Sequence, residues 1–317
     1  MSILKGARTA VNTCLKVRKS EKVVVITDTL KEEIGEAVFR AAKEAGAEAI
    51  LVKMLPRTRH GEEPPEPVAA IMKTADVVIA PTTFSLSHTQ ARKQANQAGA
   101  RIATMPTITK DMMSKGGMTA DFRQVKRHAD RLIEKIGDAK VVRVTTPDGT
   151  DIRFSVEGRK WMADTGLLHE KGAFGNLPGG ELFLPPVEGT AEGVIVVTGA
   201  LAGIGILKKP VKIIVKNGLG KEISGGAQAK AFARMLAEAS AKLEQPDNVY
   251  NLAELGIGLN PKAKLIGNPL EDEKVIGTIH LALGDNSTFG GNVKAGVHVD
   301  GIILRPTVEV DGKRLII

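Results

Sequence analysis

The sequence predicts an α/β protein with two domains. Residues 1–138 are expected to form a mostly parallel sheet with helices on both faces, and residues 139–317 a β-rich α+β domain that carries a metal site. In the first part, apolar β-branched runs alternate with amphipathic stretches of helical period, which is typical of a parallel sheet covered on both faces. In the second part, short β-type runs and glycine-containing turns follow one another, and one helical pattern interrupts them.

The first domain is predicted to begin its sheet with a buried strand at residues 21–28. An amphipathic helix over residues 29–46 follows, with Thr29 as its N-cap and Gly46 at its end. The Pro-rich stretch 56–67 is expected to be a surface loop. The remaining expected elements are a strand at 47–55, a helix at 68–75, a strand at 76–84, a helix at 88–99, a strand at 100–108 and a long helical region at 111–137.

The second domain is predicted to open with a β-hairpin over residues 139–158, which turns at a Pro-Asp-Gly sequence. A helix is expected over residues 227–243 and a last hairpin around Asp311 and Gly312. The other expected β-runs are 192–201, 209–218, 220–225, 264–267, 277–283 and 297–304.

Composition argues against several classes of protein. The 44 Lys and Arg exceed the 36 Asp and Glu, but the basic residues are scattered and aromatic residues make up 3% of the chain, so we expect no nucleic-acid binding. The single cysteine, Cys14, lies in a helix-like stretch and is read as a buried helix residue; one cysteine fits a reducing, cytoplasmic location. We see no secretion signal and no apolar run of about 18 residues, so no membrane association is expected.

Nucleotide binding is not expected either. The first strand leads into "TDTLKEE" without a glycine-rich turn, and the glycines of "VVTGALAGIGIL" precede a strand-like run instead of a helix.

A metal site is indicated by the stretch "GTIHLALGDNSTFGGNVKAGVHVDG". His298 and Asp300 are two positions apart on one predicted strand, so their side chains project from the same face. His280 lies on the preceding predicted strand. Two imidazoles with carboxylates suit a divalent ion such as Zn, Mn, Co or Fe.

Two further acids stand among apolar neighbours, where an ionised carboxylate is costly unless it is paired. Glu181 lies in "GNLPGGELFLPP", read as an irregular loop, and Glu254 lies in "NLAELGIGLNP". By contrast, "EDEK" at 271–274 is interpreted as a solvated turn, with Glu271 and Asp272 in water.

The motifs "GNLPGGE", "AELGIGLNP", "LEDEKVIGTIHLALGD" and "VHVDG" resemble those of the thermophilic aminopeptidase T/aminopeptidase S family of metallopeptidases. The resemblance implies an aminopeptidase that removes N-terminal residues from small peptides with a co-catalytic pair of Zn, Co or Mn ions. It also implies a homodimer. The matching metal ligands are Glu181, Glu254, His280, His298 and Asp300, with Glu181 and Glu254 as the catalytic acids.

One departure from that family opens an alternative. The family has a metal-site tyrosine seven residues after the first histidine, and this chain has Ser287 there. The sequence also resembles, more distantly, the dihydroxypyridine ring-cleaving dioxygenases. Under that alternative, His280, His298 and Asp300 would hold one Fe(II). A catalytically silent metal-binding protein is the third possibility.

Overall fold

The computed structural model describes residues 2–317, and the chain divides into two compact units. Unit 1 contains the described residues up to Lys126 together with Asp164–Gly180 and Asn260–Ala263; unit 2 contains Arg127–Ala163, Glu181–Leu259 and Lys264–Ile317. The predicted domains, residues 1–138 and 139–317, stay a prediction about which parts of the chain fold independently.

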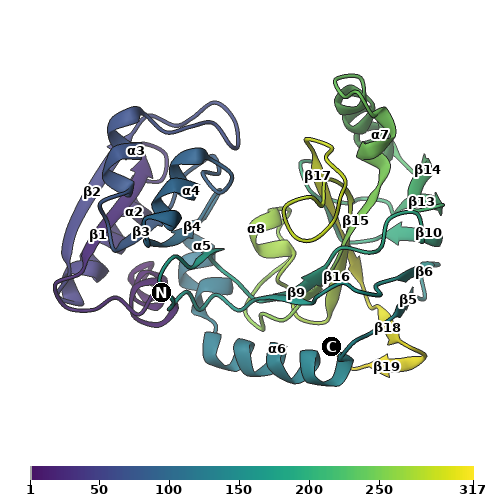
Figure 1. Ribbon diagram of the computed structural model, residues 1–317, viewed down its shortest axis with the longest axis horizontal. Coiled ribbons are helices and arrows are strands. Elements are labelled where there is room, and N and C mark those ends of the chain that lie inside the picture. The colour runs from purple at the N-terminus through teal and green to yellow at the C-terminus, as the bar shows by residue number, and fades with distance from the viewer. Residues whose placement is uncertain (1) are drawn as a thin grey trace. The chain divides into compact units, whose positions relative to one another are not determined.

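Unit 1 is built on a five-stranded sheet in which all of the paired strands are parallel (Figure 1). The strand order is β2-β1-β3-β4-β8. The strands are β1 (Lys22–Asp28), β2 (Glu48–Met54), β3 (Val77–Ala80), β4 (Arg101–Thr104) and β8 (Phe174–Asn176). The predicted parallel sheet is confirmed, and β8 is an edge strand that the sequence pattern did not reveal because it is only three residues long.

Helices cover both faces of this sheet. The helices that begin in unit 1 are α1 (Leu4–Arg8), α2 (Glu32–Glu44), α3 (Glu66–Met72), α4 (Gln90–Gln97), α5 (Lys110–Ser114) and α6 (Phe122–Ile136), which continues into unit 2; α2, α3 and α4 contact the sheet. Val24 and Ile26 of β1 share a core with Val68 of α3 and Ala91 of α4. The alternating residues of β1 point to the other face, and α2 packs along β1 and β2.

One local prediction for unit 1 is wrong and another is refined. Thr29 does not cap α2, because the N-cap is Lys31 and no side chain makes a cap hydrogen bond; the Asp28 carboxylate instead accepts a hydrogen bond from the Leu30 N–H. The long helical region predicted over 111–137 is confirmed, and it is divided into α5, a short 3₁₀ turn and α6. Glycine at 116–117 explains the break, since glycine disfavours helix interiors and a Cβ at Gly117 would lie 2.9 Å from Pro178.

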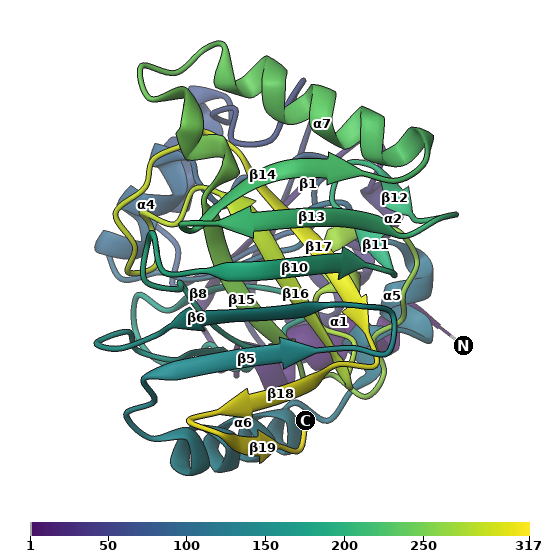
Figure 2. The ribbon, with the colours of Figure 1, turned by 90° about the vertical axis from the view of Figure 1, so that its right-hand side faces the viewer.

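Unit 2 contains two seven-stranded sheets whose strands cross at a steep angle where the sheets overlap (Figure 2). The first, in the order β14-β13-β10-β6-β5-β18-β19, consists of β5 (Val141–Thr145), β6 (Asp151–Ser155), β10 (Glu192–Val197), β13 (Val211–Lys216), β14 (Leu219–Ser224), β18 (Thr307–Val310) and β19 (Lys313–Leu315). Helix α7 (Ala227–Ser240) packs on β13 and β14. Both predicted hairpins are confirmed, as β5–β6 and β18–β19.

The second sheet carries the residues of interest, in the order β12-β11-β17-β16-β15-β9-β7. Its strands are β7 (Met162–Asp164), β9 (Glu181–Leu184), β11 (Ala200–Leu201), β12 (Gly205–Ile206), β15 (Leu252–Gly258), β16 (Thr278–Gly284) and β17 (His298–Leu304). The central pairs β9–β15, β15–β16 and β16–β17 are antiparallel.

Three predictions for unit 2 are corrected by the structure. Residues 264–267 form no strand, because Gly267 has a positive φ of 80° and helix α8 (Pro269–Asp272) begins soon after it. Glu181 begins strand β9 instead of lying in an irregular loop. Glu271 and Asp272 are not in water: they are 1% and 2% exposed, because α8 is packed against the unit.

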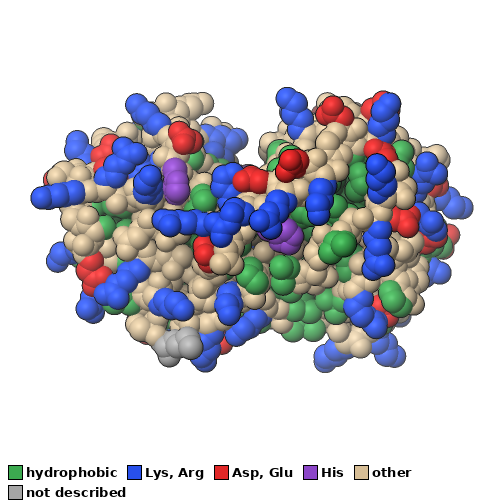
Figure 3. Space-filling view, turned by 90° about the horizontal axis from the view of Figure 1, so that it is seen from below, with side chains coloured by type: hydrophobic (Ala, Val, Ile, Leu, Met, Phe, Trp, Pro, Cys, Tyr) green, Lys and Arg blue, Asp and Glu red, His purple; other side chains and the backbone are tan. Residues whose placement is uncertain are grey.

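At the surface, Lys and Arg side chains are spread over the face shown in Figure 3, with Asp and Glu among them. Among residues 2–317, no helix is long and apolar enough to cross a lipid bilayer.

Candidate metal centre

Five acids and imidazoles lie on one face of the second sheet of unit 2. Glu254 of β15 is paired with Ala282 of β16, which is paired with Asp300 of β17, so these positions form a row across three strands. His280 and His298 are each two residues from that row and share its face. Glu181 joins them from β9, where it is paired with Gly258 of β15.

Glycine makes room for the first imidazole. Gly256 of β15 is paired with His280, and a Cβ at Gly256 would lie 1.9 Å from His280 Nε2. Any larger residue at this position would therefore displace the ring from the sheet face.

The five side chains lie close together. His280 Nε2 lies 3.1 Å from Glu254 Oε1 and 3.6 Å from Glu181 Oε2. His298 Nε2 lies 3.2 Å from Glu254 Oε2 and 3.3 Å from Asp300 Oδ1. The result is two sets of potential ligands, Glu181–Glu254–His280 and Glu254–His298–Asp300, which share Glu254. The structure thus brings together all five residues, and their roles as ligands stay a prediction.

The orientation of one imidazole and an unpartnered carboxylate oxygen both suit a bound cation. The His298 ring uses Nδ1 to hydrogen-bond the Asp285 carbonyl at 2.7 Å, which turns Nε2 towards the carboxylates. Among the described residues, Glu181 Oε2 is buried without a hydrogen-bond partner. A buried carboxylate oxygen without a donor is costly unless a cation meets it, so this N and O donor set fits a divalent metal.

The pKa values of the two imidazoles also indicate a site for a cation. Burial opposes the charged form of His280, but the hydrogen bond and the charge of Glu254, with those of Glu181 and Asp300, raise its pKa to about 9. Asp300 and Glu254 likewise raise the pKa of His298 well above its ordinary value, against the effect of burial. The carboxylates therefore stabilise a positive charge at both imidazoles. A metal ion bound there would replace the protons of the two rings.

The cluster contains two residues that the sequence analysis assigned to a solvated turn. Lys274 Nζ lies 2.7 Å from Glu181 Oε1 and 2.8 Å from Glu273 Oε2. Glu273 is hydrogen-bonded in turn to Asp300, and burial raises the pKa of Glu273 to about 8. The sequence offered one signal for them, since "EDEK" directly precedes the strand of His280; a run of charges is nevertheless more typical of a solvated surface.

Ser287 does not take the place of the tyrosine. Its hydroxyl donates to Asp285 Oδ1 at 2.8 Å, within the loop that joins β16 to β17. Ser287 belongs to neither set of potential ligands. The loop is therefore stabilised by Ser287, and the serine contributes no ligand atom.

The cluster is most open at His298. The side chain of His298 is 28% exposed, whereas those of His280, Glu181, Glu254 and Asp300 are between 1% and 11% exposed. The ring of Phe289 packs edge-on against His298 with a centroid distance of 5.6 Å, and Phe183 packs against Phe289 at 5.9 Å. A substrate would therefore approach beside two aromatic rings.

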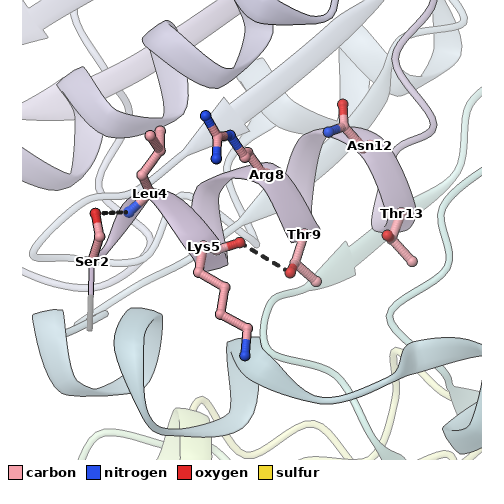
Figure 4. A pocket seen from close by; sticks show the side chains of 7 residues that line it. All are labelled: Ser2, Leu4, Lys5, Arg8, Thr9, Asn12 and Thr13. Atoms are coloured by element: carbon pink, nitrogen blue, oxygen red, sulfur yellow. Dashed lines mark hydrogen bonds between the residues drawn. The ribbon is translucent and has the colours of Figure 1, made fainter.

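A shallow hollow on unit 1 is a separate feature (Figure 4). It is lined by Ser2, Leu4, Lys5, Arg8, Thr9, Asn12 and Thr13. Arg8 is paired with Glu44, and the Thr9 hydroxyl donates to the Lys5 carbonyl. None of the predicted site residues line the hollow.

Comparison with known proteins gives one family and one fold. The model of the family NicX, 2,5-dihydroxypyridine 5,6-dioxygenase, matches residues 3–317. A 2,5-dihydroxypyridine 5,6-dioxygenase from Pseudomonas putida KT2440 is 22% identical over 258 residues, which are 78% of this chain and 71% of the relative.

Solved structures show the same architecture. The 2,5-dihydroxypyridine dioxygenase of P. putida KT2440 matches with a TM-score of 0.81 at 19% identity, over 99% of this chain and 95% of that one. AmpT from Thermus thermophilus matches with a TM-score of 0.69 at 17% identity, over 99% and 96%. These matches confirm the predicted α/β fold class with its β-rich second part.

Proposed function

Since this chain belongs to the 2,5-dihydroxypyridine 5,6-dioxygenase family, we propose that it is a mononuclear Fe(II) dioxygenase that opens the ring of an aromatic diol of the dihydroxypyridine type. The observation that carries this proposal is the match of the family model to residues 3–317. The structure adds a buried set of N and O donors on one sheet face.

His280, His298 and Asp300 would hold the iron as a set of two histidines and one carboxylate. Fe(II) held there would supply adjacent coordination positions for dioxygen and for the diol oxygens. Glu254 lies between the two imidazoles, with Oε1 3.1 Å from His280 Nε2 and Oε2 3.2 Å from His298 Nε2. It can therefore accept the proton of a substrate hydroxyl that enters beside His298.

The exposed side of the cluster suits a flat aromatic substrate. Phe289 packs edge-on against His298, the most exposed of the five predicted ligands, and Phe183 packs edge-on against Phe289. Aromatic rings gain about 0.5–1.5 kcal/mol from stacked or edge-on contacts beyond the area that they bury. We infer that Phe289 contacts the substrate ring and orients the two hydroxyls towards the metal.

A second candidate is the co-catalytic aminopeptidase suggested by the sequence motifs. The observation in its favour is that Glu254 belongs to both sets of ligands, as a carboxylate that bridges two metal ions would. Zn, Co or Mn would be the metals, and Glu181 the general base for hydrolysis of a small peptide. Against it, Glu181 Oε1 is already paired with Lys274.

The test combines metal content with two assays. Protein purified without chelator is analysed for metals, and a portion is loaded anaerobically with Fe(II). We expect about one iron per chain and consumption of one O₂ per 2,5-dihydroxypyridine, followed as oxygen uptake and loss of ring absorbance. Glu254→Gln should leave the iron bound but lower turnover.

Other outcomes would favour the remaining candidates. Two Zn, Co or Mn ions per chain with release of N-terminal residues from peptides, and no diol consumption, would replace the dioxygenase by the aminopeptidase. Bound metal without either activity would indicate a catalytically silent protein. The homodimer, the cytoplasmic location and the lack of nucleic-acid binding stay predictions.

A further inference from the structure

The feature that neither candidate function uses is a buried lysine. Lys274 is 2% exposed and is among the largest fully buried side chains of the described chain. Lysine is almost never fully buried unless it is paired. Its ammonium contacts two carboxylates, Glu181 Oε1 at 2.7 Å and Glu273 Oε2 at 2.8 Å.

The backbone fixes the position of this cation. Lys274 follows helix α8, and its N–H bonds to the Glu271 carbonyl at 3.0 Å. The next residue, Val275, lies against β15 at Gly258, where a Cβ would be 2.0 Å from the Val275 oxygen. The segment is therefore pressed onto the sheet beside Glu181, which is paired with Gly258.

The Lys274 ammonium is placed differently with respect to the two sets of potential ligands. The set Glu181–Glu254–His280 has an ammonium group in direct contact with one of its carboxylates. In the set Glu254–His298–Asp300, Asp300 is hydrogen-bonded to Glu273, which lies between it and the lysine. A fixed positive charge in a buried site strongly opposes a second cation nearby, because the interior screens charge poorly.

We propose that Lys274 is a built-in cation that takes the place of a second metal ion at Glu181 and so restricts the cluster to one ion. The inference rests on the proposed function only in that the cluster holds a metal. It gives a physical reason why five ligand-type residues serve one iron: Glu181 Oε1 is already paired with Lys274, which leaves Glu181 Oε2 as the one oxygen of this residue that can face the bound ion.

The test counts ions. Wild-type protein and Lys274→Met, which keeps the length of the side chain and removes its charge, are stripped of metal and titrated with Zn²⁺ by calorimetry. Bound zinc per chain is then measured after gel filtration. We expect one ion in the wild type and two in Lys274→Met, with the second ion bound at least about tenfold more tightly than any second ion in the wild type.

Two controls separate the local cation from net charge and from misfolding. Lys53→Met removes an exposed lysine paired with Glu32 at 2.6 Å and should leave one ion. The double variant Lys274→Met with Glu273→Gln removes the ammonium together with one of its two acid partners, so it leaves one unpaired acid fewer if the single variant folds poorly. It should also bind two ions.

The results judge the two proposals separately. One ion in both the wild type and the Lys274 variants would overturn the role of Lys274, as would a weaker single ion without a second one, or two tight ions in the wild type. Wild-type protein that takes up one ion but does not consume 2,5-dihydroxypyridine would overturn the dioxygenase and leave the role of Lys274 standing.

Discussion

Each unit contains a buried polar cluster on its sheet, and the two clusters differ in how their atoms are satisfied. In unit 1, Ser87 and Thr104 hydroxyls lie 2.7 Å apart, and both donate to Asn176 Oδ1, at 3.1 and 2.6 Å. In unit 2, acids, imidazoles and a lysine meet, and Glu181 Oε2 and His280 Nδ1 are buried without hydrogen-bond partners among the described residues.

The difference indicates what each cluster is for. Neutral groups that satisfy one another stabilise a fold and need nothing else. Charged groups that leave buried atoms unsatisfied cost free energy unless a ligand completes them. We therefore expect the cluster of unit 2 to bind a ligand, whereas that of unit 1 is part of the structure.

The largest effect is expected from His298→Ala in the charged cluster. The variant removes a predicted ligand that Asp285 orients, so metal affinity should fall by more than about 100-fold, beyond the loss typical of changes to groups that only support a ligand. The measurement is metal content after dialysis, with turnover alongside. His60→Ala, an exposed histidine of unit 1, serves as the control and should keep both. A fully active His298→Ala would rule out both enzymatic proposals.

A charged pair in unit 1 should affect stability and leave metal binding alone. Arg101 donates two hydrogen bonds to Glu21, at 3.1 and 2.8 Å, and both side chains are mostly buried. Arg101→Met leaves the Glu21 carboxylate without this partner, so the free energy of unfolding at pH 7 should fall by about 2–4 kcal/mol. Denaturant unfolding measures it, and unchanged metal content is the control.

The pH dependence of that loss has a definite sign. Burial opposes ionisation of Glu21, but the hydrogen bonds from Arg101 and Arg18 lower its pKa below the ordinary value of 4.5. A lowered folded pKa gives stability that is present above the unfolded value and is lost as the pH falls through the folded value. The difference between wild type and Arg101→Met should therefore shrink below about pH 4.5. Arg143→Met breaks an exposed pair with Asp151 and should cost less.

The smallest effect is expected at Phe289, beside the exposed side of the charged cluster. Phe289→Leu keeps an apolar side chain beside His298 but removes the aromatic contact, so KM for the diol should rise up to about tenfold while kcat changes little. Steady-state kinetics with equal iron loading provide the measurement. Phe84→Leu, which removes an aromatic partner of His60 in unit 1, should leave KM unchanged. An unchanged KM in Phe289→Leu would remove the ring from substrate binding.

Much of the fold was predictable because local patterns agree with it. The alternation around β1 and α2 gave the parallel sheet, and Asp-Gly turns gave both hairpins. The strand that carries Glu254 was not predicted. Strand β15 is buried along its whole length and therefore lacks the alternation that marks a half-buried strand. The three-residue strand β8 carried too little pattern to be seen.

For the site, the residues were predictable and their arrangement was not. The spacing of His298 and Asp300 placed them on one face, and His280 lay on the preceding predicted strand. Glu181 and Glu254 stood out as acids among apolar neighbours, and the motifs then indicated all five as ligands. No spacing indicated that Glu254 would stand between the two imidazoles, since that follows from the pairing of β15 with β16 and of β16 with β17.

By itself, then, the sequence determined the fold class, because that depends on periods along the chain, and it indicated five potential ligands through residue types and the resemblance to family motifs. Only the tertiary structure decided that Glu271, Asp272 and Lys274 of "EDEK" are buried and that Lys274 pairs with Glu181. The physical reason is that a charged run is stable either in water or among opposite charges. Which of the two applies depends on what α8 and β9 place around it.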